Sequence, residues 1–313
     1  MVQRNEIFFP SSDGKTRLHA LTWQGGGEPR AILQIAHGIC EYAGRYDAFA
    51  AFLAENGFFV VANDHLGHGK SWQDPENEGF FAEKNGWQTV VTDMEVLRAT
   101  AAAEHPGLPC FLLGHSMGSF LARSYLIRYP GKLAGAIISG TGQQAAGTVK
   151  MGRALCRTLQ KLRGAHHRSA FVRQMAFGSY NRNFKPHRTE NDWISSDPAV
   201  VDAYCADRGT QFLPTVSLYG DMMDGILFMS DPDNQKKMDK NTPILFISGS
   251  MDPVGEEGKG VERSYQGFLD AGCTDVRIKL YEGGRHEVLN EVFKAEVWDD
   301  VLHWLFEKMP RQA

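Results

Sequence analysis

Residues 110–118 read CFLLGHSMG, in which the apolar run Cys110–Leu113 leads directly into the pentapeptide Gly114–Gly118. The following residues, 119–126, have the pattern of a helix. A G-x-S-x-G sequence between a strand and a helix is typical of a nucleophile elbow, a sharp turn that exposes its serine. The flanking glycines fit because a Cβ atom at either position would collide with neighbouring backbone. We therefore predict that Ser116 lies at the carboxyl edge of a sheet, with a helix N-terminus directed towards it.

The composition limits the class of protein. The chain has 313 residues, of which 42% are hydrophobic and 22% are charged, as in ordinary soluble globular proteins. A net charge of -4 argues against a nucleic acid as partner. The five cysteines include no C-x-x-C pair, which favours reduced thiols in a cytoplasmic protein. The first residues lack the apolar segment of a signal peptide, and no apolar run approaches the roughly 18 residues of a membrane span.

Strand patterns alternate with helix patterns over most of the chain. Segments 31–36, 58–62 and 133–139 are nearly all apolar, which is typical of strands covered on both faces by helices. Residues 46–56 and 87–103 instead carry apolar side chains at helical spacing. Residues 7–23 predict an antiparallel hairpin, and further strands are expected at 243–249 and 276–281 before a closing helix. The chain therefore predicts an α/β fold with a mostly parallel, doubly wound sheet and an antiparallel N-terminal hairpin.

The alternation stops between residues 141 and 240, where no clear strand is visible. We expect this segment to form a mainly helical cap inserted into a core made of residues 1–140 and 241–313. Its second half is rich in methionine and aromatic residues, most of which should form the cap's own core. Some should face Ser116 and line an apolar tunnel, and Met222 and Ile226 are the candidates for contact with substrate.

The first part of the predicted cap is basic. Residues 150–188 include ten Lys or Arg and no Asp or Glu. Here Met151, Leu155, Leu159 and Leu162 can share one helix face, with Arg153, Arg157, Lys161 and Arg163 largely elsewhere. Such a helix predicts either peripheral contact with an anionic membrane or attraction of acidic substrates. The alternative is a solvated face neutralised by the acidic second half of the cap.

Three candidate catalytic residues each follow a predicted strand. Ser116 is followed in the chain by Asp252 and then by His286, which is the chain order Ser, acid, His. His286 would take the proton of Ser116 during attack on a carbonyl and pass it to the leaving alcohol. Asp252 would orient the imidazole and stabilise its charged form. This chemistry requires no metal and no cofactor.

Two backbone N–H groups are expected to stabilise the oxyanion. They belong to Met117, after the nucleophile, and to Ile39, in the loop after the strand 31–36. Such donors are typically worth about 10²- to 10³-fold each. Gly38 would let the backbone approach the substrate, and together with His115 it is a candidate for substrate contact.

Other histidines near these loops have a structural interpretation. His37 fits a role in bracing its loop better than one in proton transfer. His65 and His68, beside Asp64, fit either a metal site or a tight glycine turn with buried hydrogen bonds. The second interpretation is the simpler one, and no metal is predicted.

Several motifs together resemble the monoacylglycerol lipase and lysophospholipase branch of the α/β-hydrolases, which is grouped with serine aminopeptidases. The resemblance covers nearly all of the chain outside the cap. It departs from the family at Glu41-Tyr42, where Glu-His is usual, and in the cap. The motifs are His37-Gly38 with Glu41 and Arg45-Tyr46, Asp64-His65 with Gly67–Gly69 and Ser71, Gly114–Gly118, Asp252–Val254, and Arg285–Glu287.

The resemblance implies an α/β-hydrolase fold and hydrolysis of a carboxylic ester. The implied substrate is a monoacylglycerol or lysophospholipid with one fatty acyl chain under the cap. An aminopeptidase or amidase of the same fold remains an alternative, because Glu190, Asp192, Asp221 and Asp224 are available to anchor a substrate amine. A non-catalytic ligand-binding protein of this fold is a second alternative. An epoxide hydrolase or dehalogenase is disfavoured, because those enzymes carry Asp where Ser116 stands.

Overall fold

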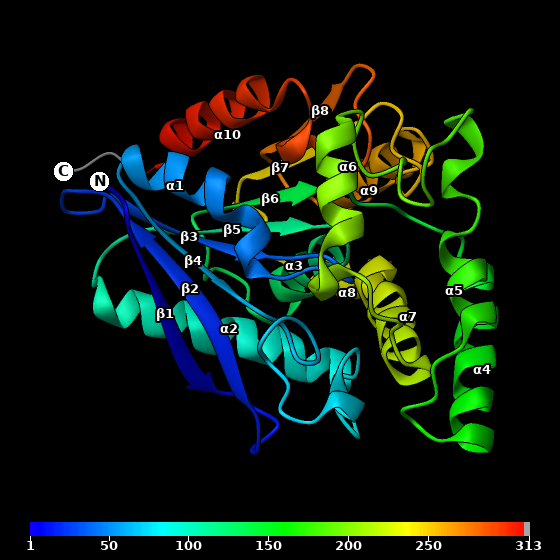
Figure 1. Ribbon diagram of the computed structural model, residues 1–313. Coiled ribbons are helices and arrows are strands. Elements are labelled where there is room, and N and C mark those ends of the chain that lie inside the picture. The colour runs from blue at the N-terminus through cyan, green and yellow to red at the C-terminus, as the bar shows by residue number, and fades with distance from the viewer. Residues whose placement is uncertain (310–313) are drawn as a thin grey trace.

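The computed structural model describes residues 1–309 and is built around one eight-stranded sheet (Figure 1). The strand order is β1-β2-β4-β3-β5-β6-β7-β8. β2 pairs antiparallel with β1 and β4, and the remaining neighbours pair in parallel. This confirms the predicted α/β class and the antiparallel hairpin. The strands are β1 (Gln3–Pro10), β2 (Arg17–Gln24), β3 (Ala31–Ala36), β4 (Phe58–Asn63), β5 (Cys110–His115), β6 (Gly135–Ser139), β7 (Ile244–Gly249) and β8 (Val276–Tyr281).

Helices cover both faces of the sheet. The helices α1 (Asp47–Glu55) and α10 (Lys294–Lys308) pack on one face, and α2 (Gly86–Glu104), α3 (Met117–Arg128) and α9 (Lys259–Asp270) pack on the other (Figure 1). Every residue of β3, β4, β5, β6 and β7 is buried, which explains their nearly continuous apolar sequences. Because β5, β7 and β8 run parallel in the sheet, their carboxyl ends meet at one edge. The loops with the candidate catalytic residues begin at this edge.

Short 3-10 helices occupy several of the connecting loops. They are η1 (Ala43–Tyr46), η2 (Pro75–Asn77), η3 (Tyr180–Asn183), η4 (Arg208–Thr210) and η5 (Val288–Asn290). The last of these precedes the closing helix α10, which begins four residues later, at Lys294.

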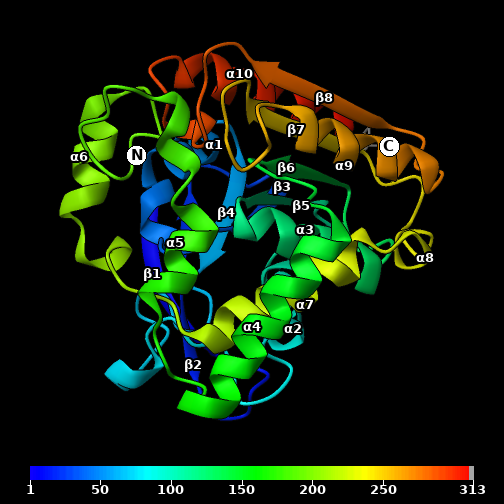
Figure 2. The ribbon, with the colours of Figure 1, turned by 90° about the vertical axis from the view of Figure 1, so that its right-hand side faces the viewer.

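The segment between β6 and β7 is helical. Its one β-bridge within the described chain joins Arg168 to Thr215. The helices lie beyond the carboxyl edge of the sheet, with α4 packed against α7 (Figure 2). α7 in turn contacts α3 and α2 of the sheet layer. The helices are α4 (Ala146–Arg163), α5 (Ala170–Phe177), α6 (Pro198–Ala206), α7 (Val216–Ser230) and α8 (Pro232–Gln235).

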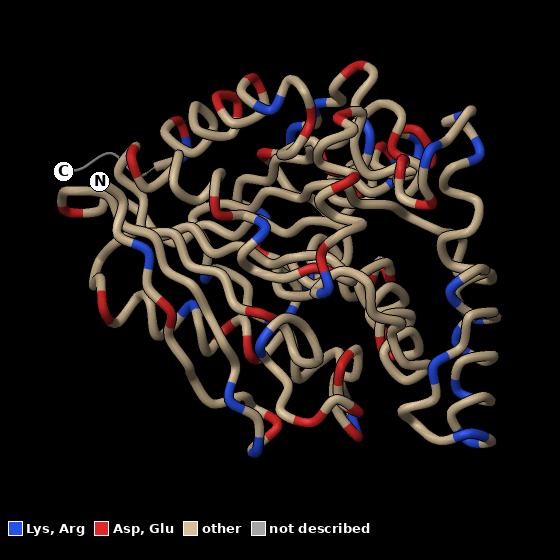
Figure 3. Tube along the Cα trace, viewed as in Figure 1, with Lys and Arg blue, Asp and Glu red and all other residues tan. Residues whose placement is uncertain are grey.

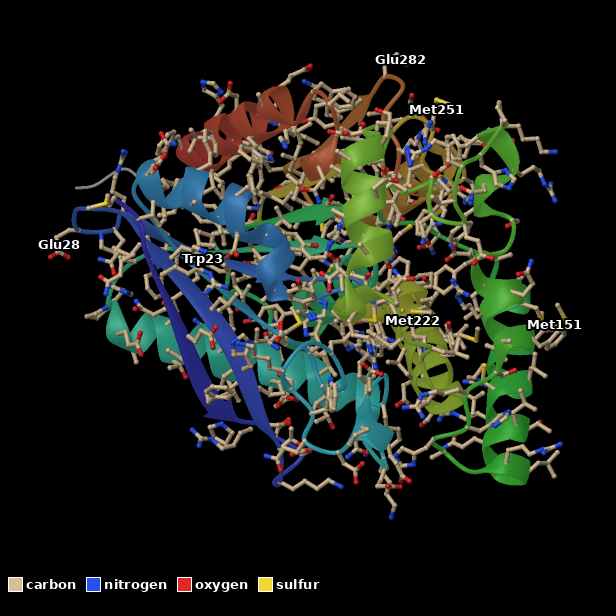
Figure 4. All side chains as sticks on the ribbon, viewed as in Figure 1. Trp23, Glu28, Met151, Met222, Met251 and Glu282 are labelled. Atoms are coloured by element: carbon tan, nitrogen blue, oxygen red, sulfur yellow. The ribbon has the colours of Figure 1, made fainter. Side chains whose placement is uncertain are left out.

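The face of α4 that packs inward differs from the prediction. Leu155 and Leu159 are partly buried, but Met151 and Leu162 are 70% and 73% exposed, and Figure 4 shows Met151 on the outer side of α4. The inward face instead includes Gly152, where an added Cβ would lie 2.7 Å from the Met223 side chain. A small residue there lets the two helices approach closely, so packing follows residue size as well as hydrophobicity.

The predicted basic face of α4 is also partly turned inward. Arg153 pairs with Asp224 at 3.1 Å, and Arg157 pairs with Asp221 and Asp224 at 2.6 Å each. Figure 3 shows Lys and Arg along α4. Part of the charge of the basic segment is thus neutralised by the acidic residues of α7.

Candidate active site

Ser116 stands in a strained turn between β5 and α3. Its φ of 54° is unusual for a residue with a side chain. Surrounding contacts hold it there, because its N–H donates to the Ser139 carbonyl at 2.9 Å and its carbonyl accepts from Ser119 Oγ at 2.6 Å. A Cβ at Gly118 would lie 2.0 Å from the carbonyl oxygen of Ala36. The second glycine is thus required by the close approach of two backbones.

The loop after β7 places Asp252 against His286, in the loop after β8. His286 Nδ1 lies 3.0 Å from each carboxylate oxygen of Asp252, which also accepts from the Val254 N–H at 2.9 Å and from Ser248 Oγ at 3.1 Å. Asp252 is fully buried and His286 nearly so. Burial alone would lower the pKa of His286, but the charge and hydrogen bonds of Asp252 outweigh it and raise this pKa.

Ser116 and His286 border the same cavity, which has a volume of about 590 Å³ and also contacts Ile39 and His115. Within residues 1–309, no hydrogen bond joins Ser116 Oγ to the imidazole; such bonds often tighten only when substrate is bound. The His115 ring lies 4.7 Å from that of His286, centroid to centroid, and burial lowers the pKa of His115 to about 3. His115 is therefore a neutral neighbour of the reacting groups.

The candidate oxyanion donors lie on two elements that meet at Ser116. Neither the Ile39 N–H nor the Met117 N–H donates to a protein acceptor in the described chain. Gly38 comes so close that a Cβ there would lie 3.0 Å from Ser116 Cβ and 2.7 Å from Glu41 Oε1. Both N–H groups are thus available to an oxygen bound beside Ser116.

A buried charged network supports this loop, and its roles were not predicted from the sequence. Glu41 accepts from the Gly38 N–H at 2.5 Å, from Arg45 at 3.0 Å and from the Tyr46 hydroxyl at 3.0 Å. Arg45 also binds both oxygens of Glu287, at 2.6 and 2.8 Å. Because Glu287 follows His286, one guanidinium joins the oxyanion loop to the histidine loop. These residues lie within the motifs quoted for the resemblance, but only the fold brings them together.

The pKa values within this network diverge. Burial opposes ionisation of both carboxyls, and it raises the pKa of Glu41. In Glu287 the bidentate contact with Arg45 overcomes burial and holds the pKa at about 2. Glu287 is thus the firmly charged partner of Arg45 near neutral pH.

The other histidines of the sheet edge are buried and structural in their contacts. His37 donates from Nδ1 to the Gly38 carbonyl at 2.7 Å and accepts the His65 N–H at Nε2, at 2.9 Å. Burial lowers the pKa of His65 to about 3 and that of His68 to about 4. Asp64 accepts backbone N–H groups from Ala43 and Lys70, at 2.8 Å each. These contacts match the interpretation of the segment as a buried hydrogen-bonded turn.

The predicted contacts of Met222 and Ile226 differ from the structure. Neither residue borders the cavity, because both pack between α7 and the neighbouring helices. Met222 is partly buried and Ile226 is buried. The cavity is bordered instead by Phe177, Trp193 and Leu213. The methionine-rich pattern indicated an apolar segment correctly, but it could not indicate that α7 would pack against other helices and leave the cavity wall to other segments.

The carboxylates available for anchoring a substrate amine are mostly engaged. Asp221 and Asp224 bind the arginines of α4, and Asp192 accepts from the Arg188 N–H and from Thr189 Oγ1. Glu190 borders the cavity and pairs with Arg173 at 3.3 Å. The side chain of Glu190 is 82% exposed. The structure therefore offers no buried free carboxylate among these four for an amino group.

No helix in residues 1–309 combines the length and the apolar character needed to cross a bilayer.

Comparisons with known proteins find relatives that match most of the chain. Residues 27–292 match the protein family described as serine aminopeptidase, S33. The chain is 31% identical over 300 residues to a monoacylglycerol lipase of Mycolicibacterium smegmatis, covering 93% of this chain and 94% of that protein. It is 28% identical over 286 residues to a monoglyceride lipase of Homo sapiens, covering 90% and 82%.

Solved structures extend the similarity over the whole fold. A highly thermostable carboxyl esterase from Bacillus coagulans, solved in complex with glycerol, superposes with a TM-score of 0.91 at 29% identity. The alignment covers 97% of this chain and 98% of the esterase. A soluble variant of a Saccharomyces cerevisiae monoglyceride lipase, at 21% identity and a TM-score of 0.79, supports the shared fold.

Proposed function

Because this chain belongs to the serine aminopeptidase S33 family, we propose that it is a serine hydrolase that cleaves carboxylic esters of single fatty acyl chains, such as monoacylglycerols or lysophospholipids. The observation that carries the proposal is the pairing of His286 with buried Asp252 beside a cavity that also contains Ser116. The names of the relatives, monoacylglycerol lipase and carboxyl esterase, support the same chemistry.

The reaction follows from the contacts. Ser116 Oγ attacks the ester carbonyl while His286 Nε2 accepts its proton, and Asp252 stabilises the imidazolium through Nδ1. The N–H groups of Ile39 and Met117 hold the oxyanion of the tetrahedral intermediate. His286 then donates its proton to the leaving alcohol, which leaves an acyl group on Ser116. Attack by water on that acyl group, with the same proton transfers, releases the fatty acid.

The helical segment 141–240 acts in this proposal as the cap over the reaction. Two of its residues hydrogen-bond the histidine loop, since the His286 N–H donates to the Trp193 carbonyl at 3.3 Å and the Glu287 N–H to the Ile194 carbonyl at 2.7 Å. Phe212 and Leu213 give another part of the cavity an apolar wall suited to an acyl chain.

The decisive experiment compares hydrolysis of p-nitrophenyl esters of increasing chain length, 1-monoacylglycerol, lysophosphatidylcholine and aminoacyl-anilides. Turnover of the acyl esters that disappears in Ser116→Ala supports the proposal. Cleavage of aminoacyl-anilides alone would establish the peptidase alternative. Ligand binding without turnover, and without labelling of Ser116 by a fluorophosphonate, would establish a binding protein.

We further propose that the outer face of α4 makes peripheral contact with anionic membranes. Met151 and Leu162 are exposed there, and Lys150, Lys161 and Arg163 are exposed around them. Apolar side chains flanked by cations are the combination that adsorbs to an anionic interface. Arg153 and Arg157 take no part, because they bind the carboxylates of α7.

The test is co-sedimentation with phosphatidylglycerol vesicles after Lys150→Glu, Lys161→Glu and Arg163→Glu together. A matched control reverses three exposed lysines elsewhere, Lys132, Lys237 and Lys259, with the same change in net charge. Weaker binding of the first variant alone supports contact through α4. Equal binding of both variants and the wild type contradicts it.

A further inference from the structure

One end of the active-site cavity is bordered by exposed cations. They come from α5 and the loop after it, and they are Arg173, Arg182 and Lys185. The geometry points to an anion subsite for the alcohol part of the substrate, which would select esters whose alcohol carries a phosphate group. This inference rests on the proposed function and specifies its substrate class.

Two of these cations have no partner among residues 1–309. Neither Arg182 nor Lys185 forms a salt bridge or donates a side-chain hydrogen bond within the described chain. Arg173 pairs with one carboxylate, Glu190, which is largely exposed and 3.3 Å away. An exposed pair of this kind is weak, so Arg173 can turn to a ligand at little cost.

The deeper part of the same cavity is electrostatically different. Arg45 borders it, but Glu41 and Glu287 occupy this guanidinium with short contacts. The Arg45 charge is neutralised by these two carboxylates, which lie in the oxyanion loop and the histidine loop. The available positive charge of the cavity therefore lies at the exposed end.

An aromatic wall connects this end to the catalytic histidine. The Trp193 ring lies 5.0 Å from His286, and Phe177 stacks on Trp193 at 6.4 Å between ring centroids. Arg173 lies one helical turn before Phe177 on α5. Tyr180, which packs on Trp193 at 4.9 Å, stands two residues before Arg182. The cations thus border the same cavity as this wall, and Arg173 and Arg182 belong to the same segments as Phe177 and Tyr180.

The reaction places the alcohol on this side. His286 must donate its proton to the leaving oxygen, so the alcohol lies next to the imidazole and the Trp193 wall. A substituent on that alcohol extends towards Arg173, Arg182 and Lys185. Arginine and lysine together suit a phosphate group, which presents several oxygens and carries more charge than a carboxylate. A neutral glycerol would leave these cations without a partner.

The test measures kcat/KM for a 1-acylglycerol and for the matching 1-acylglycerol 3-phosphate, both with short acyl chains below their micelle concentrations. We expect the phosphate ester to be preferred by about tenfold at low ionic strength, with a smaller preference as salt screens exposed charges. Arg182→Gln combined with Lys185→Gln should remove most of this preference. Equal kcat/KM for the two esters in the wild type would overturn the inference.

Arg188→Gln is a control that removes one positive charge, half as many as the double variant. Arg188 lies in the same loop, but it pairs with Asp202 and does not border the cavity. The ratio of the two kcat/KM values should stay at the wild-type level in this variant. An equal fall of the ratio in both variants would show a general effect of loop charge and would overturn the subsite.

Inhibition distinguishes a head-group subsite from a site for free anions. Glycerol 3-phosphate should inhibit hydrolysis of a neutral ester competitively, and more weakly in the double variant. Inhibition by inorganic phosphate without any preference for the phosphate ester would overturn the proposal. A loss of preference in the double variant that appears only in the presence of vesicles would also overturn the proposal, because the cations would then contact a lipid surface.

Failure of this inference is distinguishable from failure of the proposed function. Ser116-dependent hydrolysis of the neutral ester, with no preference for phosphate, leaves the esterase intact and removes the subsite. Absence of Ser116-dependent hydrolysis of any acyl ester would remove both.

Discussion

The carboxyl edge of the sheet and the helical segment between β6 and β7 both contribute charged residues to one cavity, but they hold them differently. At the sheet edge, Asp252, Glu41 and Glu287 are buried, and each has several hydrogen-bond partners. In the helical segment, Arg173 and Glu190 are exposed, and Arg182 has no partner within residues 1–309. Buried ions without partners would be costly, so the sheet edge allows little variation.

If both proposals hold, this difference separates the residues that carry out the chemistry from those that select the substrate. Groups that transfer protons need fixed positions, and backbone loops anchored to parallel strands provide them. Groups that select a head group need only to present charge, and exposed side chains on a helix and a loop suffice. Mutations at the sheet edge should therefore change turnover, whereas those in the helical segment should change substrate preference or stability.

The largest expected effect comes from Asp252→Asn. Removing its charge while keeping its shape should lower kcat on a p-nitrophenyl ester by about 10⁴-fold, because the imidazolium loses its stabilising partner. Circular dichroism and thermal unfolding check that the variant is folded. A folded variant with less than about tenfold loss would contradict the role of Asp252.

Glu41→Gln tests the charged support of the oxyanion loop. Weaker holding of Gly38 and Arg45 should lower kcat by about 10- to 100-fold, with little change in KM, because the oxyanion donors act mainly in the transition state. Tyr42→Phe is the control, since the Tyr42 hydroxyl binds Asp207 and not Glu41. Equal activities of the Glu41 variant and the wild type would show that the network only stabilises the fold.

The pH dependence tests the environment of His286. Its imidazole must be neutral to accept a proton, and Asp252 raises its pKa above the usual 6.5. Activity should therefore fall as the pH falls, with a midpoint of kcat/KM above 6.5 and about tenfold loss per pH unit well below it. A midpoint clearly below 6.5 would show that burial, and not the charge of Asp252, dominates.

The smallest expected effect is on the stability of the helical segment. Arg157→Met leaves the buried Asp221 without its partner and should lower the free energy of unfolding by about 1 to 2 kcal/mol. Arg153→Met removes a more exposed pair with Asp224 and should cost at most about 0.5 kcal/mol. Urea unfolding of both variants measures the difference. Equal free energies of unfolding for the two variants would mean that Asp221 contacts solvent or another partner once Arg157 is replaced.

Much of the sheet edge could be predicted because its sequence signals are local. The turn at Ser116 demands glycines two residues away, and Asp252 and His286 follow directly after strands. Contacts across the fold carry no such signal. Arg45 and Glu287 are 242 residues apart in the chain, and nothing in either neighbourhood indicates their ion pair. The prediction that Met222 and Ile226 of α7 border the cavity failed for the same reason, because no residue of α7 lies among those that border it.

The sequence by itself determined the order of strands and helices, the turn at Ser116 and the succession of serine, acid and histidine along the chain. These features depend on periodicity and on backbone geometry within a few residues. Only the tertiary structure decided which side of α4 is buried, which residues border the cavity and which cations remain unpaired. Those outcomes depend on how side chains of distant segments compete for the same space and the same partners, and that competition arises only when the segments pack together.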